Sequence, residues 1–178
     1  MILALSGRRI DATDAKQPRF PLGNVPSVKN ALHNLFCQKK VTSLASSAAC
    51  GADLLALSEA GALGLRRRIV IPSGRKNFRE TSVTDRPGDW GRLYDEIMDQ
   101  VEAAGDLVTL NGLSDEQAYS AVNLLILDEA FWLGQQLRQP VCAALVWDGV
   151  SRGNDDFTEK FGIEARIRNL ELFEVLTK

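Results

Sequence analysis

The fold is decided by residues 41–72, which read VTSLASSAACGADLLALSEAGALGLRRRIVIP. The apolar run at residues 41–45 is the length of a buried strand, and small residues separate it from a helix that begins near Asp53. Gly64 is placed to end that helix, and residues 68–72 supply the next strand. A strand, a helix and a second strand in this order predict two parallel strands of one sheet.

The same alternation continues on both sides of this unit. Further strands are expected at residues 2–5, 107–110, 141–147 and 170–176, and further helices after a cap at Ser27 and at residues 90–104, 115–137 and 155–166, with a polar loop at residues 75–89. Several strands are almost entirely apolar, which is typical of parallel sheets covered by helices on both faces. The sequence therefore predicts one α/β domain over residues 1–178, with a Rossmann-like, mostly parallel sheet sandwiched between helices.

The long helix at residues 115–137 carries two further predictions. Ser114 and Gln117 have the spacing of a capping box at its start. The helix is also apolar over more of its circumference than one core contact requires, and it includes Phe131 and Trp132. An exposed apolar patch on this helix would imply a partner, most simply a second copy, so we expect a homodimer.

The composition excludes several classes of protein. With 45% hydrophobic and 25% charged residues the chain is globular, and its net charge of −2 argues against binding along a nucleic-acid backbone. No apolar run approaches the length of a membrane span, and the first residues indicate a strand rather than a signal peptide. Cys37, Cys50, Cys142 and the single His33 are too scattered for a zinc site. We expect a cytoplasmic protein with buried thiols and with neither a metal nor a cofactor.

Small and polar residues follow the predicted strands, where ligands bind in open α/β sheets. They are Ser6, Gly7, Arg8, Ser46, Ser47, Pro72, Ser73, Asp148 and Gly149. We predict one cleft lined by Ser6, Gly7, Ser46, Ser47, Ser73 and Asp148. Loop cations such as Arg8, Arg79 and Arg152 could bind phosphate in a bidentate manner, although surface loops are often charged in any case.

Several well-known motifs are absent. The chain has no GxGxxG fingerprint and no GxxxxGK[ST] loop, which disfavours a standard dinucleotide site and a P-loop NTPase. His33 lies outside the loops that follow the strands, so a catalytic triad there has little support, and we interpret His33 as a residue of a helix surface.

Three stretches, in this order, resemble the bacterial branch of the SLOG superfamily. They are SAACGADLLALSEAGALG at residues 47–64, IVIP at residues 69–72 and FRETSV at residues 78–83, and Trp147-Asp148-Gly149 with Gly153 is similar to a late strand and loop of that branch. The superfamily includes the DNA-processing protein A domain and the lonely-guy phosphoribohydrolases. The resemblance implies a Rossmann-like fold and a nucleotide or nucleotide-derived ligand, bound for sensing or for cleavage of an N-glycosidic bond.

The chain departs from the lonely-guy enzymes at their PGGxGTxxE loop. The corresponding residues 149–159 keep Gly149 and Gly153, but the GGxGT run is missing and Glu159 stands at a different spacing. This departure disfavours phosphoribohydrolase activity and leaves a phosphate-binding role for the loop.

Several candidate residues have two interpretations. Gly51 and Asp53 either start a helix or contact the ligand, and Thr81 and Ser82 are either turn residues or hydroxyl donors to it. The resemblance gives Glu59 a catalytic or ribose-binding role, although it could be a surface acid. Asp148 is the candidate for binding ribose hydroxyls. Tyr119 and Asn123 share a helix face and either reach the pocket or pack in the core.

Three functions remain open on this basis. The first is binding, with a role in sensing, of a nucleotide-derived small molecule held by backbone amides near Gly7, Gly51 and residues 149–153. The second is an N-glycoside hydrolase or transferase, in which Glu59, Asp148 or Asp155 supplies a catalytic carboxylate. The third, single-stranded DNA binding, is weakened by the acidic pI and by the lack of a series of aromatic residues for stacking.

Overall fold

The computed structural model of the protein describes residues 1–110 and 115–178. The strands in this part of the chain are β1 (Ile2–Gly7), β2 (Ser43–Ser46), β3 (Arg66–Ile71), β4 (Leu107–Thr109), β5 (Val141–Trp147) and β6 (Leu172–Leu176). The helices are a short 3-10 helix (Leu22–Asn24), α1 (Val25–Gln38), α2 (Ala52–Ala62), α3 (Arg75–Ser82), α4 (Trp90–Ala103), α5 (Asp115–Leu137) and α6 (Phe157–Ile167).

The strands form one sheet in the order β4-β3-β2-β1-β5-β6, and every pair is parallel. β1 lies inside the sheet: Ile2 pairs with Ser43 on one side and with Val141 on the other. The chain builds the sheet outward from β1 to β4 and then returns to the free side of β1 with β5. The reversal of strand order therefore lies between β1 and β5. These features confirm the predicted Rossmann-like α/β fold.

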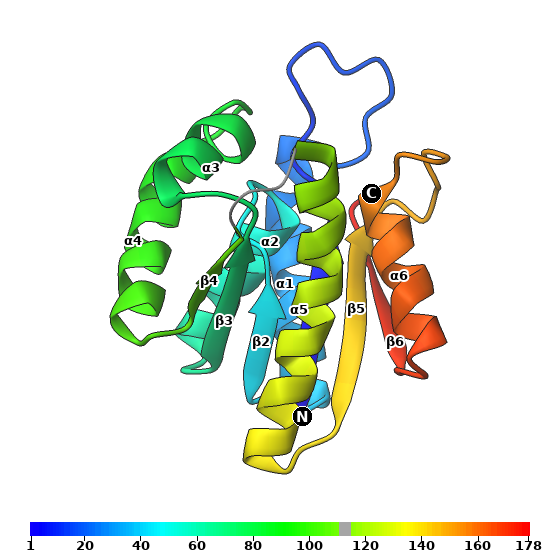
Figure 1. Cartoon of the computed structure of the whole chain (residues 1–178). Coiled ribbons are helices and arrows are strands. Elements are labelled where there is room, and N and C mark those ends of the chain that lie inside the picture. Colours follow the sequence, from blue (N-terminus) through cyan, green and yellow to red (C-terminus); the bar gives the residue numbers. More distant parts are fainter. Residues whose placement is uncertain (111–114) are drawn as a thin grey trace.

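Helices cover both faces of this sheet, as Figure 1 shows, with α5 and α6 on one face and α1 and α2 on the other. The two faces have separate hydrophobic cores, and β1 contributes to both. Leu3 and Leu5 pack with α1, α2 and α4, whereas Ile2 and Ala4 pack with α5 and α6. Because both faces of β1 are buried, its sequence has no polar alternation.

The structure corrects three predicted elements. The expected polar loop at residues 75–89 contains α3, whose buried residues are Phe78 and Ser82. Ser27 is not the cap of α1, because that helix already begins at Val25 and the Ser27 hydroxyl donates to the carbonyl of Asn24. α6 begins at Phe157 and is capped by Asp156, whose carboxylate accepts from the backbone N–H groups of the next turn. The capping box predicted at Ser114 lies outside the described residues.

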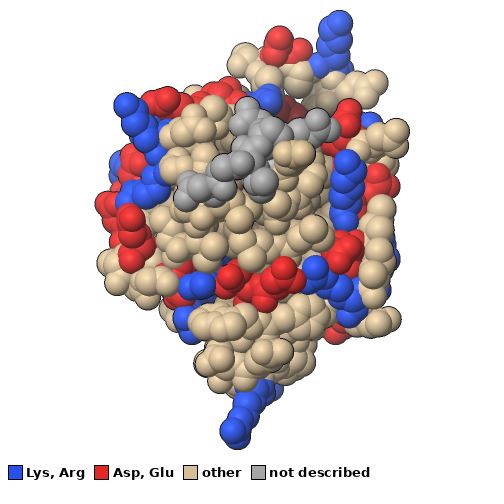
Figure 2. Space-filling view, in the orientation of Figure 1, with Lys and Arg blue, Asp and Glu red and all other residues tan. Residues whose placement is uncertain are grey.

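The outer side of α5 carries partly exposed apolar side chains. Leu124, Trp132 and Leu137 are each about two-fifths exposed. Figure 2 shows uncharged side chains above and below a belt of acidic and basic side chains that crosses the middle of this face. Trp132 is partly covered, since the guanidinium groups of Arg66 and Arg68 lie 5.6 and 4.9 Å from its ring centre. The homodimer therefore stays a prediction. Among the described helices, none combines the length and the apolar character needed to cross a membrane.

Candidate functional site

A pocket of about 610 Å³ lies at the carboxyl end of β1, beside the point where the strand order reverses. Its volume is within the range of roughly 300–1,000 Å³ that small-molecule sites occupy. Its walls come from β1 and the loop that follows, the first residues of α2, the last turns of α3, the amino-terminal half of α5 and the start of α6. The pocket is therefore where an open α/β sheet is expected to bind a ligand.

The structure brings together some of the predicted site residues and separates others. Those that line the pocket are Ser6, Gly7, Arg8, Ser47, Asp53, Ser82 and Arg152. Those that are not part of its lining are Ser46, Gly51, Glu59, Pro72, Ser73, Arg79, Thr81, Asp148, Gly149 and Gly153. Of the six residues predicted to share one cleft, Ser6, Gly7 and Ser47 do so. The other three, Ser46, Ser73 and Asp148, are not part of its lining, and Ser73 follows β3, two strands away from β1.

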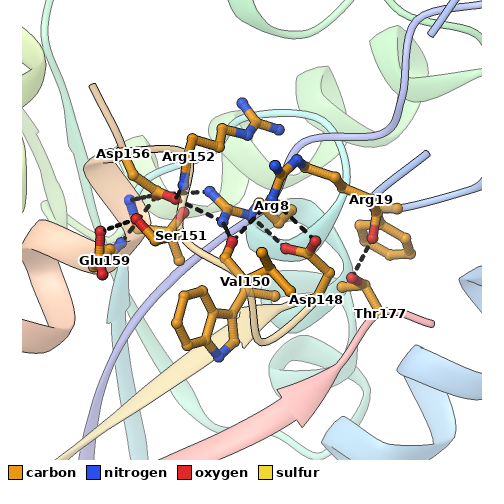
Figure 3. Close-up of polar contacts among 12 residues, drawn as sticks. Arg8, Arg19, Asp148, Val150, Ser151, Arg152, Asp156, Glu159 and Thr177 are labelled. Atoms are coloured by element: carbon orange, nitrogen blue, oxygen red, sulfur yellow. Dashed lines mark hydrogen bonds and ion pairs between the residues drawn. The ribbon is translucent and has the colours of Figure 1, made fainter. Parts of the chain in front are cut away.

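Arg8 forms a buried ionic cluster with Asp148 and Asp156, which we call the Arg8 cluster (Figure 3). Its Nη1 and Nη2 atoms donate to the two carboxylate oxygens of Asp156 at 2.6 and 2.7 Å, and its Nε donates to Asp148 at 3.2 Å. The Arg8 side chain is only 3% exposed. Burial by itself would raise the pKa of both carboxyl groups, but the hydrogen bonds and charge of Arg8 lower each pKa below its ordinary value. Arg8 is thus fully engaged inside the protein.

Asp148 is also engaged on its other side. Its Oδ2 atom accepts from Arg19 Nη1 at 3.0 Å and lies 3.6 Å from Lys178 Nζ. Arg19 is held in place by the loop that carries it, because Asp11 accepts from the backbone N–H groups of Arg19 and Phe20. The predicted ribose-binding carboxylate is therefore already surrounded by cations of the protein, and it is not part of the pocket lining.

Gly7 and Gly51, whose backbone amides were predicted to bind phosphate, lie where neighbouring atoms leave no room for a side chain. A Cβ atom on Gly7 would come within 2.3 Å of Ala52 Cβ, and one on Gly51 within 2.7 Å of the backbone N of Ile10. In the late loop, the N–H of Arg152 donates to Asp156 and the N–H of Gly153 donates to Ser151 Oγ. The loop amides at these two positions are therefore occupied, and anion binding here depends on side chains.

Two cations of the pocket are available for an anion. No hydrogen bond or ion pair within the described chain reaches the side chains of Arg152 and Lys16, and no dashed line reaches the Arg152 guanidinium in Figure 3. Burial lowers the pKa of Arg152, and the positive charges of Arg8 and Arg19 lower it further. A guanidinium held beside two other cations is stabilised by a bound anion.

Asp53, in the first turn of α2, presents an unsatisfied carboxyl group to the pocket. The residue is 7% exposed, and its Oδ2 atom accepts from the N–H of Ala49 at 3.3 Å. Its Oδ1 atom and the neighbouring Ser46 Oγ are buried and form no hydrogen bond of ordinary geometry, although the Ser46 hydroxyl is close enough to lower the pKa of Asp53. Burial raises the pKa of Asp53 to about 7, against the opposing effects of the backbone N–H groups of Ala49 and Gly7, the hydroxyl of Ser46 and the charge of Arg9. Because an unpaired buried polar atom is costly, this oxygen is a candidate ligand contact.

Aromatic and apolar side chains form the remaining wall. The rings of Tyr119 and Phe157 lie 5.9 Å apart at a tilt of 41°. Tyr119 shares a 2.9 Å hydrogen bond with Ser82, and Asn123 Nδ2 donates to the carbonyl of Phe157 at 2.7 Å. Both interpretations of Tyr119 and Asn123 therefore hold, because each lines the pocket and each is hydrogen bonded locally.

The other predicted residues form contacts elsewhere. Glu59 faces α1, where its carboxylate contacts His33 and Lys29. Arg79 is paired with Asp95. The Thr81 hydroxyl donates to the carbonyl of Asn77, whose own side chain donates to Ser73 Oγ. The structure thus separates Glu59, the proposed catalytic acid, from the pocket.

Sequence reasoning missed several cations of the pocket. Arg9, Lys16, Arg19 and Arg86 all line it. The signal for Arg9 was its position directly after β1, but nothing in the loop sequence indicated that Lys16 and Arg19 fold back over the strand ends. Within residues 1–110 and 115–178, no three His, Cys, Asp or Glu side chains are grouped as metal ligands would be. Comparison with protein-family models and with curated proteins gives no match for this chain.

Proposed function

We propose that this pocket binds a nucleotide or a nucleotide-derived small molecule, and that binding rather than turnover is its role. The observation that carries the proposal is the presence in one pocket of an unpaired guanidinium on Arg152 and an unpaired carboxyl oxygen on Asp53. The first favours an anionic group, and the second favours a group that donates a hydrogen bond. A nucleotide has both, in its phosphate and in its ribose or base.

The same pocket also has a nonpolar part to its lining. Tyr119, Phe157, Phe78 and Ile126 line the same pocket, and aromatic faces of this kind bind nucleobases by stacking. The location at the strand reversal also agrees with the proposal, since this is where nucleotides bind in open α/β sheets. The resemblance of residues 47–83 to the SLOG superfamily supports the same ligand class.

The proposal is tested by thermal unfolding with a panel of nucleoside monophosphates and diphosphates, the matching nucleosides and inorganic phosphate. A ligand that binds only the folded protein raises the melting temperature, by an amount equivalent to about 2.7 kcal/mol at one hundred times its Kd. We expect nucleotides to stabilise the protein more than either nucleosides or phosphate do. If no nucleotide raises the melting temperature, the proposal is wrong.

Substitutions then assign the two contacts. Arg152→Gln removes a charge-assisted hydrogen bond worth roughly 1.5–3 kcal/mol, so nucleotide affinity should fall about tenfold or more. The matched control is Arg92→Gln on α4, which removes the same charge from an exposed site remote from the pocket lining. Equal affinities for these two variants would contradict the role given to Arg152.

Asp53 also favours a second candidate, hydrolysis of an N-glycosidic bond. A carboxyl group with a pKa of about 7 exchanges its proton near neutral pH, which general acid–base catalysis requires. Of the three acids named from the sequence, Asp155 lines the pocket, whereas Glu59 and Asp148 do not. In this alternative the reacting acid is Asp53, because it also lines the pocket and is buried, whereas Asp155 is exposed.

Release of free base separates the two candidates. A binding protein releases no base from any nucleoside monophosphate, and Asp53→Asn then changes affinity alone. Base release by the unmodified protein that is lost in Asp53→Asn, with binding retained, would establish the enzyme instead. Glu59→Gln is the control, since Glu59 lies between α1 and α2 and should leave base release unchanged.

A further inference from the structure

A chain of three reactive side chains lies between α1 and α2, outside the lining of the pocket. His33 and Cys37 are one helical turn apart on α1, with Cys37 Sγ 3.6 Å from His33 Nε2. Glu59 reaches the same histidine from α2, with its Oε1 atom 2.6 Å from His33 Nδ1. Thiol, imidazole and carboxylate are therefore joined in the order in which nucleophile, base and orienting acid stand in activated cysteines.

The contact with Glu59 determines which imidazole nitrogen carries the proton. A carboxylate oxygen accepts hydrogen bonds, so His33 Nδ1 carries the hydrogen and donates it to Glu59. The lone pair of the neutral ring is then on Nε2, which faces the thiol of Cys37. Glu59 is itself buried, and Lys29 Nζ lies 3.9 Å from its second oxygen. This arrangement holds His33 in the tautomer that can accept the thiol proton.

Cys37 differs from the other two cysteines in its surroundings. Cys50 and Cys142 are buried, and burial raises the pKa of both thiols, that of Cys142 to about 12. The expectation of buried thiols is wrong for Cys37, which is exposed and has an imidazole nitrogen within hydrogen-bonding distance. Of the three thiols, Cys37 alone combines access to solvent with a base.

We propose that Cys37 is a site of thiol–disulfide exchange with small disulfides, with His33 as the base and Glu59 as the residue that positions His33. The Cys37 thiol transfers its proton to His33 Nε2, and the resulting thiolate attacks one sulfur of the disulfide. The S–S bond of the reagent breaks as the new one forms, and the departing thiolate takes the proton from His33. The disulfide is the oxidant, and the products are a mixed disulfide on Cys37 and one free small thiol.

The location of Cys37 favours this chemistry over acyl transfer. An acyl-transfer enzyme needs hydrogen-bond donors around the developing oxyanion, which a cleft or loop has to supply. Cys37 is in the last turn of α1, on an exposed part of the helix. Disulfide exchange distributes its charge over sulfur atoms and requires only an accessible thiolate, which this position provides.

The test measures how fast the folded protein reacts with oxidised glutathione and with an aromatic disulfide that releases a coloured thiolate. At pH 7 an ordinary cysteine is only a few per cent thiolate. We therefore expect His33→Asn to slow modification about tenfold, and Glu59→Gln to slow it several-fold. Asn34→Ala, an exposed neighbour on α1, is the control and should match the unmodified protein. Cys37→Ser should abolish the fast reaction, and mass spectrometry should place the glutathione on Cys37.

Two further measurements distinguish proton transfer from a change of structure. At alkaline pH thiols ionise without a base, so the unmodified protein, His33→Asn and Glu59→Gln should react at the same rate. Lys29, whose Nζ lies 3.9 Å from Glu59, is unchanged in all three. In concentrated urea all three should also react alike. The proposal is overturned if His33→Asn reacts at pH 7 as fast as Asn34→Ala, or if its slower rate persists at alkaline pH.

Discussion

Two groups of buried polar side chains at the carboxyl end of the sheet differ in how completely they are hydrogen bonded. The Arg8 cluster joins one guanidinium to two carboxylates through three side-chain hydrogen bonds, and Arg19 adds a fourth to Asp148. Asp53 and Ser46 each keep a buried oxygen with no partner in the described chain. The first group is fully hydrogen bonded without a ligand, whereas the second is not. The difference indicates which of the pocket's buried polar residues hold the fold together and which are available to a ligand.

The two groups also give stability opposite dependences on pH. Asp148 and Asp156 have pKa values below the ordinary value near 3.9, so their contribution is complete above that pH and is lost as the pH falls through their folded pKa values. Asp53 has a pKa of about 7, above its unfolded value, so the folded protein retains a proton that the unfolded chain releases. Its effect is to lower stability as the pH rises from about 4 to about 7.

Breaking the Arg8 cluster should have the largest effect. Arg8→Met keeps much of the side-chain volume but leaves two buried carboxylates without their cation, and we expect the free energy of unfolding to fall by about 3–5 kcal/mol. Urea denaturation at pH 7 measures this change, with Arg92→Met on the surface of α4 as a control within about 0.5 kcal/mol of the unmodified protein. A loss below about 1 kcal/mol would show that the cluster does not stabilise the fold.

Removing the charge of Asp53 should act in the other direction. Asp53→Asn cannot ionise, so the variant should gain up to roughly 4 kcal/mol at pH 8, which is the equivalent of a pKa difference of about three. The gain should shrink as the pH falls and vanish below about pH 3, where Asp53 is protonated in both states. Unfolding curves at several pH values measure it, and a difference that does not vary with pH would contradict the raised pKa.

A pair of identical substitutions sharpens the comparison. Ser82→Ala removes a hydroxyl that is hydrogen bonded to Tyr119, and we expect a loss of about 1 kcal/mol. Ser46→Ala removes a buried hydroxyl without a partner, so stability should stay equal or rise by about 1 kcal/mol. Both are measured at pH 5, where Asp53 is mostly protonated. Losses of the same size in both variants would show that Ser46 has a partner.

The smallest effect on stability is expected at Arg152. Arg152→Gln removes a cation that repels Arg8 and Arg19, so the free energy of unfolding should change by no more than about 0.5 kcal/mol. The same substitution should weaken nucleotide binding, so thermal unfolding with and without nucleotide separates the two effects. A large loss of stability in the absence of ligand would place Arg152 with the Arg8 cluster instead.

Most of the fold could be predicted because its signals are local. The apolar runs of β1, β3 and β5 and the stop at Gly64, whose φ is +69°, depend on neighbouring residues in the sequence. α3 was missed because it buries only Phe78 and Ser82, which is too few residues to give an apolar period. The start of α1 was misplaced because a serine next to a helix is a common cap, whereas this helix had already begun at Val25.

The site could be predicted only in part, for a physical reason. Strand ends identify an edge of the sheet, and Ser6, Gly7 and Ser47 were found in this way. Whether a charge is free or paired depends on residues far away in the chain. Nothing near Asp148 indicates that Arg8 and Arg19 occupy it, and nothing near Arg152 indicates that it has no such partner.

The position of β1 inside the sheet has a consequence during synthesis of the chain. Ile2 finds its partner Ser43 early, but its other partner, Val141, leaves the ribosome much later. Until then β1 has an unpaired, apolar edge, which is a template for pairing with other chains. The late pairing of β5 with β1 closes this edge and brings Asp148 and Asp156 to Arg8. The pairing of β5 with β1 is thus the event that both completes the ligand site and removes the edge at which nascent chains could aggregate.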